Sequence, residues 1–248
     1  MFKASAIEFR FRFLIHVIII ILAFWAPWDY VLHLDTGLRP RQIIATWLTR
    51  NHWLGFEAAT IAVTIAAILF ALVGAIFRTW GAAYLRPSVV KAASLHGDSI
   101  VAAGPYRHLR NPLYLGTWLH TIALAMLLPP SGAIFAILLI GIEQLRLIGA
   151  EEAFLTEKLG APYRSYKANV PRLWPSLLPR VAGSGQQPNW PNAFLSEIYT
   201  WGVVLSFAIM GWRYNIFPII QGVLISLGAS LIARAFISSP QETPQTKT

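Results

Sequence analysis

Two short segments of the chain concentrate the residue types that could do chemistry. The first, DSIVAAGPYRHLRNPLYLG at 98–116, gathers arginines, an asparagine and tyrosines around glycine and proline turn signals. The second, EEAFLTEKLGAPYRSY at 151–166, opens with two adjacent carboxylates, Glu151 and Glu152. A carboxylate can hold a cation or accept a proton, and an arginine such as Arg146 can hold a carboxylate through two parallel hydrogen bonds.

Each of these features also has an ordinary structural explanation. Asn111 and Pro112 are typical of a helix start, with asparagine at the N-cap and proline at the first helical position. The acidic pair could be solvated where a helix leaves a bilayer, and the tyrosines could form an aromatic belt at the membrane surface. The order and spacing of the whole set are therefore more informative than any single residue.

The stretch between the two segments predicts how they meet. It is mostly apolar and contains a Pro129-Pro130 turn, with Pro129 seventeen residues after Pro112 and Pro130 seventeen before Leu147. Each arm is then about 25 Å long as a helix. An antiparallel hairpin with equal arms returns its ends to the same depth. We therefore expect residues 110–114 to meet residues 147–152.

The composition favours a membrane protein. Of 248 residues, 56% are hydrophobic and 12% are charged, and the mean hydropathy is +0.54, whereas soluble domains carry about 25% charged residues. These values argue against a soluble enzyme and exclude a disordered chain. Six stretches approach the roughly 20 apolar residues that span a bilayer, and they lie at 13–32, 56–77, 113–128, 133–148, 193–212 and 216–236. We expect an all-α polytopic membrane protein with about six transmembrane helices, the first interrupted by Pro27 and Asp29.

The basic residues predict the orientation of these spans. With the N-terminus in the cytoplasm, sixteen of the 20 lysines and arginines lie on the cytoplasmic side, and Arg39, Arg41, Arg50 and Arg213 lie outside. Both termini and the site where segments 98–116 and 151–166 meet are then cytoplasmic. The net charge of +9 suits an anionic membrane face, and no nucleic-acid partner is expected. The chain has no cysteine and its six histidines share no ligand spacing, so no metal site is expected.

The apolar runs and the prolines divide the chain into regions. We expect an N-terminal two-helix membrane region at 1–78 with an interfacial helix at 41–50, a core at 79–180, a linker at 181–192, a C-terminal transmembrane hairpin at 193–237 and a disordered tail at 238–248. Trp174 and Trp190 are candidate interfacial anchors. His16 and His120 lie within spans, where each is either functional or bonded to a neighbouring helix.

The two segments together resemble the isoprenylcysteine carboxyl methyltransferase family and the related phospholipid methyltransferases, which are membrane-embedded enzymes that use S-adenosylmethionine. Their pattern is G-x-Y, then R-H-P-x-Y-x-G, a transmembrane hairpin, E-E, and G-x-x-Y-x-x-Y. In this chain the pattern reads Gly104-Pro105-Tyr106, Arg110 to Gly116, Glu151-Glu152, and Gly160 with Tyr163 and Tyr166. The resemblance covers roughly residues 79–180.

The resemblance implies a set of residues that contact S-adenosylmethionine, namely Lys91, Asp98, Ser99, Ile100, Val101, Gly104, Tyr106, Arg110, Asn111, Pro112, Leu113, Tyr114 and Glu151. This cofactor presents cations, a carboxylate and an adenine ring. Glu151 suits the cations, and backbone N–H groups at the start of the third span, with Asn111, suit the carboxylate. Ile100, Val101 and Tyr106 suit the adenine.

Two positions depart from the family pattern. Asn111 stands where the family usually has histidine, and asparagine cannot titrate, so a proton-transfer role is lost there while a cofactor-holding role is not. Leu147 stands where the family has a substrate-binding arginine, and Arg146 is one position earlier, rotated by about 100° on a helix. Arg146 compensates for that loss, or the substrate differs.

The nucleophile follows from the same residues. A substrate carboxylate needs orientation and water exclusion but no base, whereas an amine needs a base, for which Glu152 is the candidate. We therefore predict methylation of a carboxylate on a lipidated or lipid-like acceptor, with Arg146 and Glu152 as catalytic residues. The alternatives are a phospholipid amine N-methyltransferase, an NADPH-dependent sterol-type membrane reductase, and a non-catalytic membrane protein in which Glu57 and Glu143 line a pathway.

Two observations argue against the reductase and the transporter-like alternatives. The short 98–112 loop is small for a dinucleotide, and the spans show no inverted repeat of the transporter kind. The last two spans either cover a lipid cavity or mediate dimerisation. Neither the identity of the acceptor nor the oligomeric state follows from the sequence.

Overall fold

The computed structural model describes residues 3–25, 30, 37–85, 101–212 and 215–236. Within these ranges the chain is helical and contains no strand, so the all-α prediction is confirmed for them. The helices are α1 (Ala6–Phe24), α3 (Pro40–Arg50), α4 (Phe56–Ala83), the 3₁₀ turn η1 (Gly104–Arg107), α6 (Pro112–Ala125), α7 (Pro130–Leu159), α8 (Ala161–Asn169), α9 (Trp190–Ser196), α10 (Ile198–Met210) and α11 (Phe217–Phe236).

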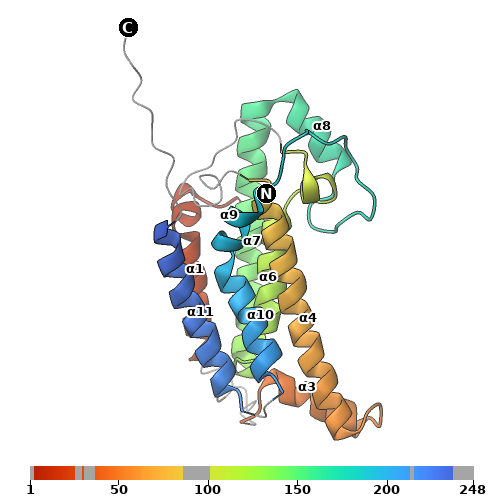
Figure 1. The fold of residues 1–248 in the computed structure, drawn as a ribbon, viewed down its shortest axis with the longest axis vertical. Coiled ribbons are helices and arrows are strands. Elements are labelled where there is room, and N and C mark those ends of the chain that lie inside the picture. The colour runs from red at the N-terminus through yellow and green to blue at the C-terminus, as the bar shows by residue number, and fades with distance from the viewer. Residues whose placement is uncertain (1–2, 26–29, 31–36, 86–100, 213–214, 237–248) are drawn as a thin grey trace.

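The long helices run along the longest axis of the molecule, with α3 at one end and η1 and α8 at the other (Figure 1). Among the described residues, α4 and α7 are long and apolar enough to cross a membrane, and the bent pair α9–α10 adds a third candidate if it counts as one span. Helix α11 is apolar but shorter. The fold is thus a helical membrane protein with two or three candidate spans. The six spans and their orientation stay predictions.

Two of the expected spans differ from the helices that form. The third was expected at 113–128, but α6 ends at Ala125 and has 14 residues, so it is about 21 Å long. Residues 126–128 turn instead, because their backbone N–H groups bond three residues back rather than four. The first was expected at 13–32, and α1 ends at Phe24; residues 26–29 and 31–36 lie outside the described part.

Close packing of α4 on α6 depends on two glycines. A Cβ atom on Gly116 would lie 2.6 Å from the carbonyl oxygen of Gly74, and one on Gly74 would lie 2.8 Å from the carbonyl oxygen of Gly116. Fully buried alanines on both helices, Ala71, Ala75 and Ala123, continue the contact. Small residues let helix backbones approach closely, which is how helices associate where the surrounding solvent is lipid.

Helix α1 packs along α7, and its His16 contacts two polar side chains of α7. Ile19 and Ala23 of α1 meet Ala136 and Ile140 of α7. Nε2 of His16 lies 2.8 Å from Oε2 of Glu143 and 2.9 Å from Nε2 of Gln144. His16 therefore has the neighbouring-helix partners that one of its two sequence interpretations anticipated.

Helix α3 closes the opposite end of the bundle. The buried Arg41 donates from Nη1 to the carbonyl oxygen of Gly211, 3.1 Å away, at the C-cap of α10. A cation there complements the negative end of the helix dipole. Ile43, Ile44 and Trp47 of α3 are exposed. The helix predicted at 41–50 is thus present, and its place at a membrane surface stays a prediction.

The segment after α8 is hydrogen-bonded to the loop that precedes α6. Residues 171–184, here called the strap, run antiparallel to residues 102–110. The amides of Ser176 and Arg180 donate to the carbonyls of His108 and Arg107, at 3.0 and 2.8 Å, and the amide of Arg110 donates to Pro171 at 2.9 Å. The strap therefore fixes the loop that precedes α6. Trp174 in it is 86% exposed, as a surface anchor would be.

Candidate active site

The hairpin brings the two predicted segments together. The hydroxyl of Tyr114, in the first turn of α6, donates to Oε2 of Glu151 on α7 over 3.0 Å. Nη2 of Arg110 lies 3.2 Å from Oε1 of Glu152. The expectation that residues 110–114 meet residues 147–152 is confirmed by these two contacts. Both lie toward the end of the bundle where η1 and α8 gather (Figure 1).

Asn111 begins α6 in a way that the sequence did not predict. It occupies the N-cap position before Pro112, but its side chain makes no capping hydrogen bond. Instead its Nδ2 donates to the carbonyl oxygen of Arg172 in the strap, 3.1 Å away. The first helical amide bond of α6 is that of Leu115 to the carbonyl of Asn111. The amides of Leu113 and Tyr114 therefore lack the usual cap, and such amides bind anions.

Glu152 is the centre of a buried ion cluster. It is 2% exposed, and its carboxylate lies 2.6 Å from Nη2 of Arg172, 3.2 Å from Nη2 of Arg110 and 3.6 Å from Nζ of Lys167. Arg110 also donates to the carbonyl oxygen of Lys167 over 2.6 Å. The cluster joins α7, α8, the strap and the start of α6, so Glu152 holds the site together.

Glu151 has a different environment although it is the next residue. Successive helical residues point about 100° apart, and Glu151 is half-buried with the Tyr114 hydroxyl as its hydrogen-bond donor. It belongs to none of the ion pairs among the described residues, although the charge of Arg12 on α1 acts on it. Of the adjacent carboxylates, Glu151 is therefore the one available to a cationic ligand.

Tyr106 of η1 is held by hydrogen bonds near the two segments. It is buried, its hydroxyl lies 3.4 Å from the carbonyl oxygen of Gly81, and its own carbonyl accepts a 2.8 Å hydrogen bond from Tyr166. Burial and the nearby Glu151 carboxylate raise the pKa of Tyr106 well above its usual value. Gly104 before it has φ +51°, and a Cβ there would meet the ring of Tyr84, so glycine is required.

The tyrosines do not form an aromatic belt. Tyr106, Tyr163 and Tyr166 are each buried, and the rings of Tyr163 and Tyr166 lie 5.8 Å apart. They pack on Val170 under the end of α7. The belt interpretation is therefore wrong for these three residues, because Tyr163 and Tyr166 of α8 are covered beside Val170 and Tyr106 is buried in η1.

Arg146 lies with α1 rather than with the ion cluster. Its Nη2 donates to both carboxylate oxygens of Glu8 at 2.9 Å, and its Nε donates to Oε1 at 3.2 Å. The Arg146 side chain, with the Ser5 amide, lowers the pKa of Glu8 to about 2. The fully buried Leu147 occupies the adjacent direction. Arg146 thus already binds a carboxylate in a forked geometry.

The remaining predicted contacts divide into two groups. Lys91, Asp98, Ser99 and Ile100 lie outside the described residues. Pro112 is buried and Leu113 half-buried against Gly81 of α4, and Val101 is half-buried beside η1. Among the residues that the structure describes, no group of three His, Cys, Asp or Glu side chains could hold a metal ion.

Sequence reasoning missed Arg172 and Lys167 as members of the site. Both were counted only as cytoplasmic charges, because nothing in their local pattern sets them apart from other basic residues. Arg78 was missed for the same reason: its guanidinium binds Glu197 through two hydrogen bonds of 2.6 and 2.8 Å and also donates to Thr117 of α6. Each depends on partners more than ten residues away.

Comparison with known proteins agrees with this architecture. The family model described as phospholipid methyltransferase matches residues 61–161, from the second turn of α4 to the first residue of α8. Searches of curated proteins and of solved structures gave no match. The family match supports the membrane methyltransferase family of the isoprenylcysteine carboxyl methyltransferase and phospholipid methyltransferase type, and so confirms the resemblance. The family indicates a membrane methyltransferase with lipid-like substrates.

Proposed function

We propose that this protein transfers the methyl group of S-adenosylmethionine to a carboxylate on a lipid-like acceptor, at the site where the start of α6 meets Glu151. The observation that carries the proposal is the 3.0 Å hydrogen bond from Tyr114 to Glu151. It joins the two halves of the family pattern across the hairpin. The half-buried Glu151 carboxylate is thereby joined to the first turn of α6, whose leading amides have no side-chain cap.

The residues present fit the cofactor in charge and in hydrogen-bonding capacity. Glu151 supplies a carboxylate that the Tyr114 hydroxyl bonds and that belongs to none of the ion pairs among the described residues, with Arg12 as the cation whose charge acts on it. The amides of Leu113 and Tyr114 supply donors at the positive end of α6. Nε of Arg110 is buried and has no hydrogen-bond partner among the described residues, which leaves one more donor. A ligand with both an ammonium and a carboxylate matches this set.

Each residue then has a distinct part in the reaction. When bound, S-adenosylmethionine supplies an electrophilic methyl group on a positively charged sulfur. Glu151 holds the ammonium group, and Tyr114 keeps the Glu151 carboxylate oriented. The amides of Leu113 and Tyr114 hold the carboxylate, and the buried Tyr106 excludes water from the side of η1. Orientation and water exclusion are the main aid to a displacement that joins opposite charges.

The environment of Glu152 favours a carboxylate acceptor over an amine. An amine must lose a proton, and Glu152, the base predicted for that step, is surrounded by Arg110, Arg172 and Lys167. Its carboxylate already has these three cations as partners within 3.6 Å, so it is engaged in the ion cluster and not open to a substrate ammonium group. We therefore assign Glu152 to positioning. Arg146, which already forks onto a carboxylate, is the residue that would bind the acceptor.

Calorimetry of purified protein in detergent tests the cofactor assignment. We expect wild type to bind S-adenosylhomocysteine and S-adenosylmethionine, and Glu151→Gln to bind both about tenfold more weakly or worse, because a charge-assisted contact is lost. Glu157→Gln is the matched control, since Glu157 is an exposed carboxylate on the same helix. Equal affinities for wild type and Glu151→Gln would refute the site.

The chemistry of the product tests the acceptor. Membranes containing the protein are incubated with S-adenosylmethionine labelled in its methyl group, and the lipid extract is treated with alkali. A methyl ester releases the label as methanol, whereas an N-methyl group keeps it. Alkali-stable label would replace the carboxylate proposal with amine methylation and leave the cofactor site intact.

A further inference from the structure

A second site lies on a different face of α7. An open cleft of about 420 Å³ is lined by the stripe of α7 that carries Glu152 and Glu157, by Lys3 before α1, and by Arg164, Lys167 and Arg172. Glu151 is absent from this lining. The cleft therefore lies on a different face of α7 from the proposed cofactor site, and Glu152 lies between the two.

The cleft concentrates positive charge. Four cationic side chains and two carboxylates line it. Glu152 is already shared among Arg172, Lys167 and Arg110. Lys3 and Arg164 are exposed and form no ion pair within the described part of the chain. Like charges held around one concave space repel one another, so an anion placed there is stabilised.

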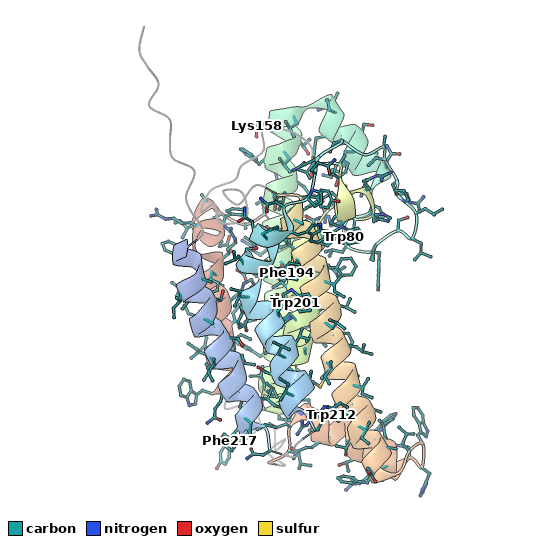
Figure 2. All side chains as sticks on the ribbon, viewed as in Figure 1. Trp80, Lys158, Phe194, Trp201, Trp212 and Phe217 are labelled. Atoms are coloured by element: carbon teal, nitrogen blue, oxygen red, sulfur yellow. The ribbon has the colours of Figure 1, made fainter. Side chains whose placement is uncertain are left out.

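The position of the cleft indicates where that anion comes from. Its floor is the last part of α7, whose apolar length makes it a candidate membrane span. Lys3 lies two residues before Ser5, which caps the start of α1. In Figure 2, Lys158, next to Glu157 in sequence, marks the end of α7 beyond the helix bundle. Basic pockets at the ends of membrane helices are suited to anionic lipid headgroups.

We propose that this cleft binds the phosphate of an anionic lipid headgroup, with Arg164 and Lys3 as the residues that contact it. Arg164 supplies a planar fork of donors, which matches a phosphate group. Lys167 and Arg172 add positive potential while they hold Glu152. The bound lipid is not the methyl acceptor, and the proposal does not rest on methyl transfer.

Binding of short-chain lipids to the full-length protein in a non-ionic detergent tests this site. The probes are dioctanoyl phosphatidic acid, dioctanoyl phosphatidylcholine and inorganic phosphate, measured by calorimetry. We expect phosphatidic acid to bind more tightly than the other two. Arg164→Ala weakens that binding by about fivefold or more, the effect of one surface cation near an anionic headgroup, and Arg164→Lys weakens it less.

Arg180→Ala is the matched control, because Arg180 is an exposed arginine in the strap outside the cleft lining; its affinity should equal that of wild type. Raising the salt concentration should weaken binding of phosphatidic acid to wild type, since the contact is electrostatic. Phosphatidylcholine bound as tightly as phosphatidic acid, or unchanged affinity in Arg164→Ala, would overturn the proposal. Inorganic phosphate bound as tightly as the lipid would assign the cleft to a soluble anion and overturn it equally.

Discussion

Arg78 and Glu197 form a forked ion pair between α4 and the bend that separates α9 from α10. Nε and Nη2 of Arg78 lie 2.6 and 2.8 Å from the two oxygens of Glu197, and Glu197 is 1% exposed. One residue further along α4, Thr79 accepts a 2.9 Å hydrogen bond from the Trp201 indole. Phe194 and Trp201 lie beside this junction (Figure 2). Helices α9 and α10 are thus fixed by polar contacts to α4, most of which lies within the residues 61–161 that match the family model.

Arg78→Met is expected to destabilise the protein by about 3 kcal/mol, because it leaves the Glu197 carboxylate buried without its cation. The double variant Arg78→Met/Glu197→Leu should recover most of that loss, since no unpaired charge remains. Thermal or denaturant unfolding in detergent measures both. A double variant as unstable as the sum of the two single variants would show that the pair is not coupled.

Substitutions of Glu151 and Glu152 should have different effects, the first on cofactor affinity and the second on the free energy of unfolding. Glu152→Gln leaves Arg110, Arg172 and Lys167 without their counter-charge, so we expect a loss of about 2–4 kcal/mol in unfolding free energy. Glu151→Gln should unfold close to wild type while its cofactor affinity falls. Unfolding curves and calorimetry on the same preparations test the contrast. Similar stability losses in both variants would contradict the division of roles.

The glycine contact between α4 and α6 should tolerate no side chain. Gly116→Ala places a Cβ against the Gly74 carbonyl and the Arg78 side chain, so we expect a destabilisation of about 1–3 kcal/mol from overpacking. Gly228→Ala in α11 is the control, because a Cβ there meets nothing within 4 Å. That variant should be neutral or slightly stabilised, since alanine favours a helix. Midpoints of thermal unfolding in detergent distinguish the two.

The pairing of Glu8 with Arg146 should depend on pH. Because the folded pKa of Glu8 is lowered from 4.5 to about 2, the stability that the pair contributes is fully present above pH 4.5 and is lost as the pH falls toward 2. Wild type and Glu8→Gln should therefore differ in thermal midpoint at pH 7 and converge at acid pH. A difference that persists unchanged at pH 3 would exclude the ion pair as its source.

The same pair gives a test of the acceptor arginine. If Arg146 binds the carboxylate of the acceptor, Glu8 competes for it. Glu8→Gln should then lower the KM for the acceptor several-fold, and Arg146→Gln should raise it by about tenfold or more. The KM for S-adenosylmethionine should change in neither. An acceptor KM insensitive to both substitutions would remove Arg146 from the site.

The sequence by itself determined that the protein is helical and apolar, and which two segments meet at the end of the hairpin. Apolar runs, the Pro129-Pro130 turn and the equal distances to Pro112 and Leu147 are local properties, and a helix has a fixed rise per residue. The equal lengths of the two arms were therefore sufficient to predict that Tyr114 and Glu151 meet. The end of α6 at Ala125 could not be predicted in this way, because the turn at 126–128 depends on packing of Leu127 and Leu128 in the core.

Only the tertiary structure decided what each side chain in the site does. Glu151 and Glu152 are adjacent residues of the same type. Arg110 before α6, Lys167 of α8 and Arg172 of the strap distinguish them by pairing with Glu152, whereas Tyr114 bonds Glu151. Asn111 turns from its cap to the Arg172 carbonyl for the same reason. Charged and amide groups take the partners that reach them in space. Because those partners come from distant parts of the chain, no local pattern specifies them.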